Sequence, residues 1–278
     1  MKITITAEST IDLPQELLNK YDIKTMPYSI YLGETLCYDG QISTKEIFDF
    51  VDKNKILPQT GAINEFQYTE FFENNLKDCD AIIHFALSSE ISSACSNAIK
   101  ASKKFNNVFV VDTKSLSTGI ALLAIKARKM AACGKDAKTI YEQLILDREK
   151  LQVSFVIDKL DYLKKGGRCS SIMAFGANLL KIHPQIVVKN GKMVSGKKYL
   201  GNFESVIKKY VPDTLKEYGN IDNTIAFVTY TTASEESIEF AKNALKNAGF
   251  KEVYNTTAGA TISSHCGPNT FGILYLTV

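Results

Sequence analysis

The chain has 278 residues, of which 45% are hydrophobic and 23% are charged. This composition is typical of a globular protein and argues against a disordered or fibrous chain. The 33 basic and 30 acidic residues leave a net charge of +3 without any basic tract, which argues against nucleic acid as the main partner, since duplex binding usually needs clustered Lys and Arg. The length accommodates two domains or one large domain.

Neither end of the chain has the pattern of a membrane or secretory segment. Residues Met1–Glu8 alternate apolar and polar side chains and reach an acid early, unlike a signal peptide. The longest uncharged run, Val253–Val278, contains polar residues such as Asn255 and Pro268, and a bilayer span requires a more apolar composition. We expect a soluble cytoplasmic protein with no integral membrane segment.

The cysteines and histidines do not form a metal-binding pattern. The six cysteines are far apart, contain no C-x-x-C pair and have no histidine at ligand spacing. Their even number is compatible with three disulfides, but without a signal peptide reduced thiols are the favoured interpretation. We expect no metal and no cofactor.

Residues 1–150 alternate strands and helices, which is typical of a largely parallel sheet. Strands are predicted at Ile3–Thr6, Ala81–Ala86 and Val108–Val111, and a strand or hairpin at Lys24–Leu32, which runs into a Gly33-Glu34 turn. Helices are predicted at Pro14–Lys20, Thr44 to about Lys53, Phe66–Leu76, up to Lys104, Thr118–Ala132 and about Ala137–Lys150. We expect an N-terminal three-layer α/β domain over residues 1–150.

Three of these helices have recognisable start signals. Asp12 is predicted to be the N-cap of the first helix, and Asn64 the N-cap of the third. Ser43 and Glu46 have the spacing of a capping box. The strand Ala81–Ala86 is almost entirely apolar, as expected of a parallel strand that is buried on both faces.

Residues 151–278 predict a smaller α+β domain with a mixed sheet, placing the boundary near residue 150. Asn190-Gly191, between two short β runs, is the strongest hairpin signal in the chain. Strands are predicted at Val153–Ile157, Ile186–Lys189, Lys192–Ser195, Thr224–Tyr230, Lys251–Tyr254 and Gly272–Leu276, helices at Phe203–Tyr218 and Glu235–Ala248, and a glycine-containing segment at Leu160–Leu180.

Three loops rich in small polar residues follow predicted strands or precede predicted helices: Glu8–Thr10, Pro58–Gly61 and Ser88–Ser93. Ligands of open α/β sheets bind beyond the carboxyl ends of the strands, and hydroxyls beside free helix N–H groups favour an anion. The same residues are also ordinary N-caps and turn formers, so both interpretations remain open.

Lys164–Arg168 imitates a phosphate loop, although the chain contains neither a dinucleotide fingerprint nor a Walker loop, which makes a nucleotide enzyme the weakest hypothesis. The segment can hold a phosphate or the acidic groups of a partner, or it can be a basic helix C-terminus closed by glycine. Arg168 is the residue of this segment to test. His84 and His183 are interpreted as structural.

His265 lies in Ser263–Pro268, a predicted loop before the last strand. A serine hydrolase acting on acyl esters is one interpretation, with Ser92 as nucleophile and His265 as base. The G-x-S-x-G motif is absent, however, and no acid stands out to orient the imidazole.

Several segments together resemble the DegV family, the bacterial fatty-acid-binding proteins that include the FakB carriers. In chain order they are Glu8–Pro14, Tyr38–Gly40, Pro58–Asn64, Ser88–Ala98, Leu160–Arg168 and His265–Asn269. They extend across the whole chain. The chain departs from the family pattern at Glu8, where aspartate is usual, and at Ser93 and Asn269, where glycine is usual.

The resemblance implies a two-domain α/β protein that encloses one long-chain fatty acid, such as palmitate, between its domains. The carried-over carboxylate contacts are Thr60, Ser92 and His265, with Arg168 near the pocket mouth. The family implies a lipid carrier without catalysis, which presents the carboxylate to a fatty acid kinase in lipid transport or phospholipid metabolism.

Overall fold

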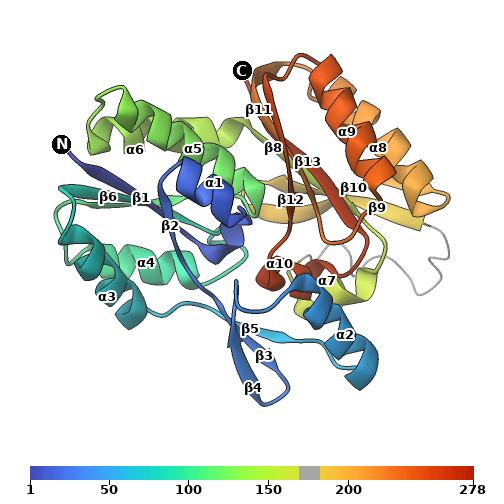
Figure 1. Cartoon of the computed structure of the whole chain (residues 1–278), viewed down its shortest axis with the longest axis horizontal. Helices are drawn as coiled ribbons and strands as arrows, with labels where there is room; N and C mark the ends of the chain where they lie inside the picture. The colour runs from blue at the N-terminus through green and yellow to red at the C-terminus, as the bar shows by residue number, and fades with distance from the viewer. Residues whose placement is uncertain (169–181) are drawn as a thin grey trace.

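The computed structural model describes residues 1–168 and 182–278, and these form three β-sheets with helices packed around them (Figure 1). The predicted segment Leu160–Leu180 therefore lies partly outside the described residues, and Cys169 lies wholly outside them. Cys37, Cys79, Cys95 and Cys133 are free thiols.

The first sheet has four parallel strands in the order β2-β1-β6-β7. Its strands are β1 (Ile3–Glu8), β2 (Ile23–Met26), β6 (Ala81–Ala86) and β7 (Val108–Asp112). Every residue of β1 and β6 is buried, and for β6 this confirms the prediction of a parallel strand buried on both faces.

Helices cover both faces of this sheet, giving the predicted three layers (Figure 1). On one side lie α3 (Glu65–Leu76) and α4 (Ala94–Ser102), and on the other lie α5 (Thr118–Ala132) and α6 (Ala137–Asp147). The short helix α1 (Gln15–Lys20) and the 3-10 turns η1 (Ser9–Ile11) and η2 (Arg148–Lys150) lie at the edges. The predicted Asn64 cap is confirmed as a capping box with Gln67.

The second sheet is mixed and has six strands in the order β10-β9-β8-β13-β11-β12, of which only the pair β11-β12 is parallel. Its strands are β8 (Leu151–Ile157), β9 (Ile182–Lys189), β10 (Lys192–Leu200), β11 (Ile221–Tyr230), β12 (Glu252–Thr257) and β13 (Thr270–Thr277). Asn190 and Gly191 both have positive φ, as the predicted hairpin requires. Helices α8 (Phe203–Glu217) and α9 (Glu235–Asn247) pack on this sheet.

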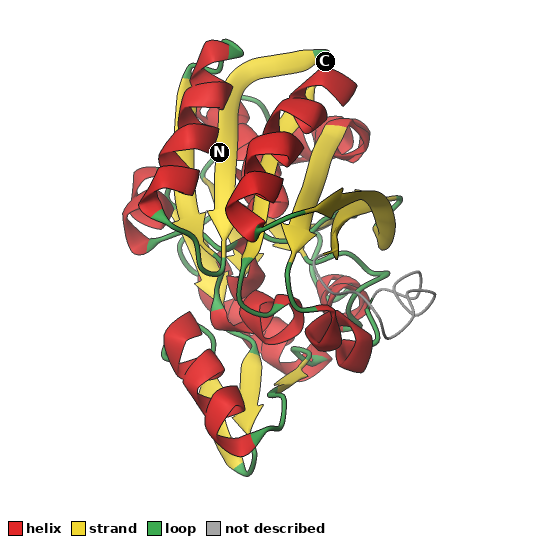
Figure 2. Ribbon diagram, turned by 90° about the vertical axis from the view of Figure 1, so that its right-hand side faces the viewer, coloured by secondary structure: helices red, strands yellow, loops and turns green. Residues whose placement is uncertain are grey.

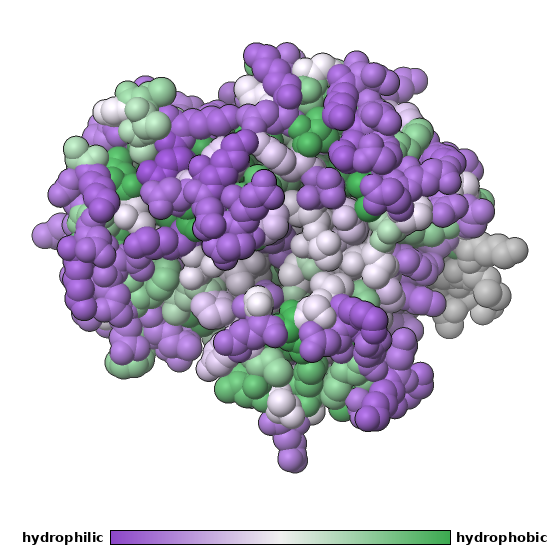
Figure 3. All heavy atoms as spheres, in the orientation of Figure 1, coloured by the Kyte–Doolittle hydropathy of each residue, from purple (hydrophilic) through white to green (hydrophobic). Residues whose placement is uncertain are grey.

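A third, antiparallel sheet has the order β4-β3-β5 and projects with α2 below the two larger sheets (Figure 2). It consists of β3 (Ser29–Leu32), β4 (Thr35–Tyr38) and β5 (Gln59–Gly61), and α2 is Thr44–Asn54 with the predicted Ser43 capping box. Hydrophobic surface gathers over this lower part of the molecule, where Tyr31 and Leu36 are exposed (Figure 3).

The hairpin expected at the Gly33-Glu34 turn is confirmed by the antiparallel pairing of β3 with β4, but a continuous strand before it and one predicted helix cap are wrong. The predicted strand Lys24–Leu32 divides at Pro27-Tyr28 into strands of different sheets, because Pro27 has no N–H to donate to a ladder. Asp12 does not cap α1. It has φ +55°, ends η1, and uses its carboxylate for Ser117 and the backbone of Gly259.

The sequence analysis also missed one helix, α10 (Ala260–Cys266), so the prediction of a loop around His265 is wrong. This helix contacts α2, β5, η1 and α7 (Leu160–Gly166), and therefore lies where the small sheet meets the rest of the molecule. Its position determines where His265 is held.

One hydrophobic core extends across both large sheets. Helix α5 contacts β1 and β6 of the first sheet as well as β8, β11 and β13 of the second. The same core cluster contains Ile5 and Phe85 from the first sheet and Phe155 and Phe227 from the second. The division of the chain near residue 150 remains a prediction. In residues 1–168 and 182–278, no helix is long and apolar enough to cross a membrane.

Candidate functional site

A cavity of about 490 Å³ opens between the end of the first sheet, the small sheet, α10 and the β9–β10 hairpin. This volume is within the usual range for small-molecule sites. Thr60, Ser92, His265 and Arg168 all line it, so the structure brings together the four residues that the sequence singled out.

His265 is held by the way α10 is anchored at its first turn. The N–H of Gly259 donates to Asp12 Oδ1 and the N–H of Ala260 to Asp39 Oδ1, both at 2.9 Å. Carboxylates at a helix N-terminus satisfy free N–H groups and complement the helix dipole. Burial raises the pKa of Asp12 well above its ordinary value, and its hydrogen bond from Ser117 opposes that shift.

The imidazole of His265 lies between Thr60 and α7. Its Nε2 is 2.8 Å from the Thr60 hydroxyl, and a Cβ placed on Gly166 would lie 2.8 Å from its Nδ1. Thr60 was expected in a loop, but it lies on β5 and pairs with Ile30 of β3. Burial, and then the charge of Arg168, lower the pKa of His265 to about 4, so the ring is neutral at neutral pH.

Ser92 lies at the start of α4, beyond the carboxyl end of β6. Its hydroxyl oxygen accepts the N–H of Ala94 at 3.2 Å and lies 3.1 Å from the hydroxyl of Tyr28. The predicted combination of a hydroxyl and a helix N-terminus is therefore present, and the residue serves both as a helix-start group and as a cavity wall.

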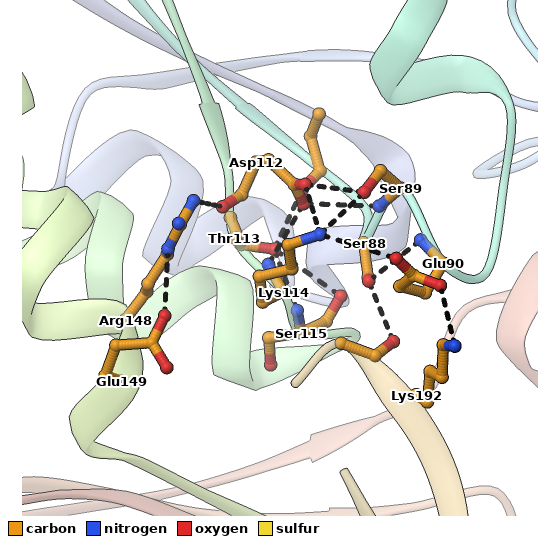
Figure 4. A network of polar contacts seen from close by, with 12 residues as sticks. Ser88, Ser89, Glu90, Asp112, Thr113, Lys114, Ser115, Arg148, Glu149 and Lys192 are labelled. Atoms are coloured by element: carbon orange, nitrogen blue, oxygen red, sulfur yellow. Dashed lines mark hydrogen bonds and ion pairs between the residues drawn. The ribbon is translucent and has the colours of Figure 1, made fainter. Parts of the chain in front are cut away.

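The loop that carries Ser92 is fixed by a polar network (Figure 4). Ser88 donates to the Gly191 carbonyl at 2.8 Å, which ties the loop to the β9–β10 hairpin. Ser89 donates to Asp112 at 2.6 Å, and Lys114 bridges Asp112 at 3.0 Å and Glu90 at 3.8 Å. The loop is thus held between the end of β7 and the hairpin of the second sheet.

Arg168 lines the cavity and is exposed to solvent. A second opening of about 380 Å³ shares Thr60, Arg168 and His265 with the main cavity. Among the described lining residues of the main cavity, Arg168 is the one cationic side chain. It follows α7, whose basic last turn ends at Gly167 with φ +68°, so the helix C-terminus interpretation is confirmed. That finding leaves a partner role for Arg168 open.

Part of the cavity wall is apolar. Leu116, Ile262 and Cys266 line both the main cavity and a smaller hollow of about 20 Å³ that is walled by residues such as Phe155 and Leu274 of the second sheet. Apolar side chains therefore connect the main cavity to a hollow beside the second sheet.

Ser9 and the histidines other than His265 make structural contacts. In the loop Glu8–Thr10, Ser9 donates to Asp39 and does not line the main cavity. His84 is buried, has its Nδ1 2.9 Å from the Thr6 hydroxyl, and has a pKa lowered by burial to about 3. His183 has its Nε2 3.1 Å from the Gly201 carbonyl oxygen. Within the described part of the chain, no group of three or more His, Cys, Asp or Glu residues could hold a metal.

The sequence analysis missed the apolar lining and the residues behind Ser92. Met193 and Ile262 line the cavity from the hairpin and α10, and Tyr28 lines it beside Ser92. Tyr28 reaches Ser92 across 64 residues, and no local pattern signals such a contact.

Comparison with known proteins shows which family this chain belongs to. A family model described as an uncharacterised protein of the DegV family matches residues 2–278. The chain belongs to the DegV family. Among its curated DegV relatives, a fatty acid-binding protein from Thermotoga maritima is 28% identical over 98% of this chain and 96% of the relative. A DegV domain-containing protein from Deinococcus radiodurans is 26% identical over 98% of both.

Solved DegV structures share the whole fold. The structure described as fatty acid binding of a DegV family protein from Thermus thermophilus has a TM-score of 0.91 at 25% identity and covers 100% of both chains. A stearic acid-binding protein from Eubacterium ventriosum has a TM-score of 0.86 at 25% identity, with 99% of this chain and 98% of that chain covered. The α/β class predicted from the sequence is thereby confirmed.

Proposed function

We propose that this DegV protein binds one long-chain fatty acid, such as palmitate, with the carboxylate at Thr60, Ser92 and His265 and the acyl chain directed inward. The observation that carries the proposal is one cavity lined by all three side chains, together with apolar residues that also line a hollow beside the second sheet. The relatives described as fatty acid-binding proteins support the same ligand class.

The two ends of the ligand contribute differently. Burying roughly 14 methylenes at ~0.8 kcal/mol each supplies about 11 kcal/mol before the costs of association. The carboxylate contributes less, because its hydrogen bonds in the cavity replace hydrogen bonds to water. The apolar wall therefore supplies affinity, whereas the three polar side chains fix which end lies at the mouth.

We expect native mass spectrometry to detect co-purified fatty acid. Ser92→Ala and His265→Ala should each weaken palmitate binding by about 1–3 kcal/mol without unfolding the protein. Ser96→Ala is a matched control, since Ser96 also lines the cavity but its hydroxyl already donates to the Ser93 carbonyl. Wild-type affinity in both site variants would contradict the carboxylate assignment.

We further propose that the protein is a non-catalytic carrier that presents the carboxylate to a fatty acid kinase. The support is that Thr60 and His265 also line the second opening, which Arg168 borders. With a bacterial fatty acid kinase and ATP, the palmitate-loaded protein should yield acyl phosphate. Arg168→Gln should reduce that yield at saturating palmitate, and an unchanged yield would remove Arg168 from the partner contact.

A serine hydrolase is the alternative, since Ser92 and His265 line the same cavity. Among the described residues, however, Ser92 is bonded to Tyr28 and Ala94, and His265 to Thr60. Turnover of a nitrophenyl acyl ester that disappears in Ser92→Ala would establish the hydrolase and overturn the non-catalytic assignment.

A further inference from the structure

A buried carboxyl group lies behind the head-group site. Glu8, at the end of β1, is 0% exposed. It accepts hydrogen bonds from the hydroxyls of Tyr68 at 2.5 Å and Tyr28 at 3.1 Å, and from the N–H of Leu87 at 2.9 Å. Burial raises the pKa of Glu8 to about 7, so the group changes charge near neutral pH.

Tyr28 connects this carboxyl group to Ser92. Its hydroxyl lies 3.1 Å from Glu8 Oε2 and 3.1 Å from Ser92 Oγ, but a phenol has only one hydrogen to donate. If that hydrogen goes to Glu8, the Tyr28 oxygen is left to accept, and Ser92 is the hydroxyl placed to donate to it. If it goes to Ser92, the Ser92 hydrogen remains available to the cavity.

We infer that Glu8 is a positioning residue which, through Tyr28, decides whether the Ser92 hydroxyl is free to donate to a bound carboxylate. The inference rests on the proposed fatty acid site. An ionised Glu8 accepts the Tyr28 hydrogen, because charge-assisted hydrogen bonds are stronger than neutral ones. The Tyr28 oxygen can then accept the Ser92 hydrogen, in competition with the carboxylate of the ligand. A neutral Glu8 donates to Tyr28, which donates to Ser92, and the competition ends.

Among the titratable groups that surround Glu8 and the cavity beside it, the pKa shifts leave Glu8 as the group that changes charge near pH 7. Tyr28 comes from the β2–β3 connection, Tyr68 from α3 and Cys95 from α4, and burial raises the pKa of all three. His84 on β6 packs edge-to-face against Tyr68, and its lowered pKa keeps it neutral. On the cavity side, His265 is neutral as well. Palmitate affinity should therefore fall as pH rises through the pKa of Glu8.

The test is the dissociation constant of palmitate measured from about pH 6 to about pH 8.5 on the full chain. In the wild type it should rise about tenfold, the effect of losing one hydrogen bond to a charged group. In Glu8→Gln, which cannot ionise, only the change due to the ligand's own titration should remain. Identical profiles in the two proteins would overturn the inference.

Two tyrosine variants separate the hydrogen-bond relay from simple charge repulsion. Tyr28→Phe removes the connection while Glu8 still titrates, so its profile should match that of Glu8→Gln. Tyr68→Phe removes the other phenol on Glu8 without touching Ser92, and should keep the dependence with a midpoint at higher pH. A wild-type profile in Tyr28→Phe would overturn the relay.

Calorimetry of the wild type in two buffers of different ionisation enthalpy gives a second measurement that needs no variant. Palmitate binding near pH 7.5 should take up about half a proton, the maximum that a tenfold change in affinity allows, and the uptake should decrease towards pH 6, where Glu8 already holds its proton. Uptake that increases towards low pH would indicate His265 and overturn the assignment to Glu8. If the wild type binds no palmitate at any pH, the proposed function fails, and this inference fails with it.

Discussion

At the scale of single residues, the contact between Gly166 and His265 shows how closely the head-group site is fitted. A Cβ on Gly166 would lie 2.8 Å from His265 Nδ1, a distance that real side chains do not adopt. Gly166 lies in α7, where alanine would otherwise be favoured. We therefore expect Gly166→Ala to displace the imidazole and to weaken palmitate binding about tenfold.

The neighbouring glycine provides the control. Gly167 has φ +68° and no heavy atom within 4 Å of a built Cβ, so Gly167→Ala adds backbone strain but displaces no side chain. It should lower the free energy of unfolding by about 1 kcal/mol and leave palmitate affinity unchanged. Equal affinities in the two variants would show that the Gly166 contact does not position His265.

Glu8 also makes the stability of the protein depend on pH. Its pKa is about 7 in the folded state, against an ordinary value of 4.5. Because the folded state holds the proton more tightly, this stabilisation is complete below about pH 4.5 and is lost as pH rises through 7, roughly 3 kcal/mol in all. Urea unfolding at several pH values should show this loss in the wild type. Glu8→Gln should lack it, and an equal loss in the variant would assign the effect to another group.

The sequence could identify the candidate site residues that lie in recognisable motifs, but not the buried residues that contact them. Thr60, Ser92 and His265 follow from their segments, and all three line one cavity. In the sequence, Glu8 appears as part of a polar loop and as a departure from the usual aspartate, and neither signal connects it to Ser92. Its link to Ser92 passes through Tyr28, and these long-range contacts depend on strand order rather than on local spacing.

At the scale of secondary structure elements, local signals predicted those helices that carry their own caps or long apolar faces. Helix α5 begins and ends at Thr118 and Ala132, as predicted, and α2 has its predicted capping box. Strand β5 has three residues, too few for a periodic pattern. Helix α10 is short and rich in serine and threonine, so its stability comes from distant carboxylates and not from propensity.

The anchoring of α10 predicts a selective effect of Asp39→Ala. Asp39 accepts the N–H groups of Ala260 and Thr261 and the hydroxyl of Ser9. Its removal should cost about 1–2 kcal/mol of stability and also weaken palmitate binding, because α10 carries His265.

Ser234→Ala is the matched control for the Asp39 variant. Ser234 is the side-chain N-cap of α9, a helix on the second sheet that contributes no residue to the cavity lining. We expect a stability loss of about 1 kcal/mol by chemical denaturation, with palmitate affinity unchanged. A parallel loss of affinity in both variants would mean that binding follows overall stability and not the position of α10.

At the scale of the whole molecule, α5 unites the two halves of the chain. The alternation of elements predicts a parallel sheet followed by a mixed one, and both are present. The pattern does not reveal that α5 packs on both sheets. Nearly every face of this helix is apolar, so its sequence indicates that the helix is buried but not which sheets it contacts.

This shared helix predicts that the protein unfolds as one cooperative unit despite its separate sheets. The core cluster contains residues from both sides of position 150, so neither half can keep its core when the other unfolds. Calorimetry should give a single transition whose calorimetric and van't Hoff enthalpies agree. Palmitate contacts both halves in the proposed site, and at about 100 times its dissociation constant it should add about 2.7 kcal/mol and shift the whole transition upward. Two transitions, or a ligand shift confined to one of them, would show that the halves fold independently and that α5 belongs to only one.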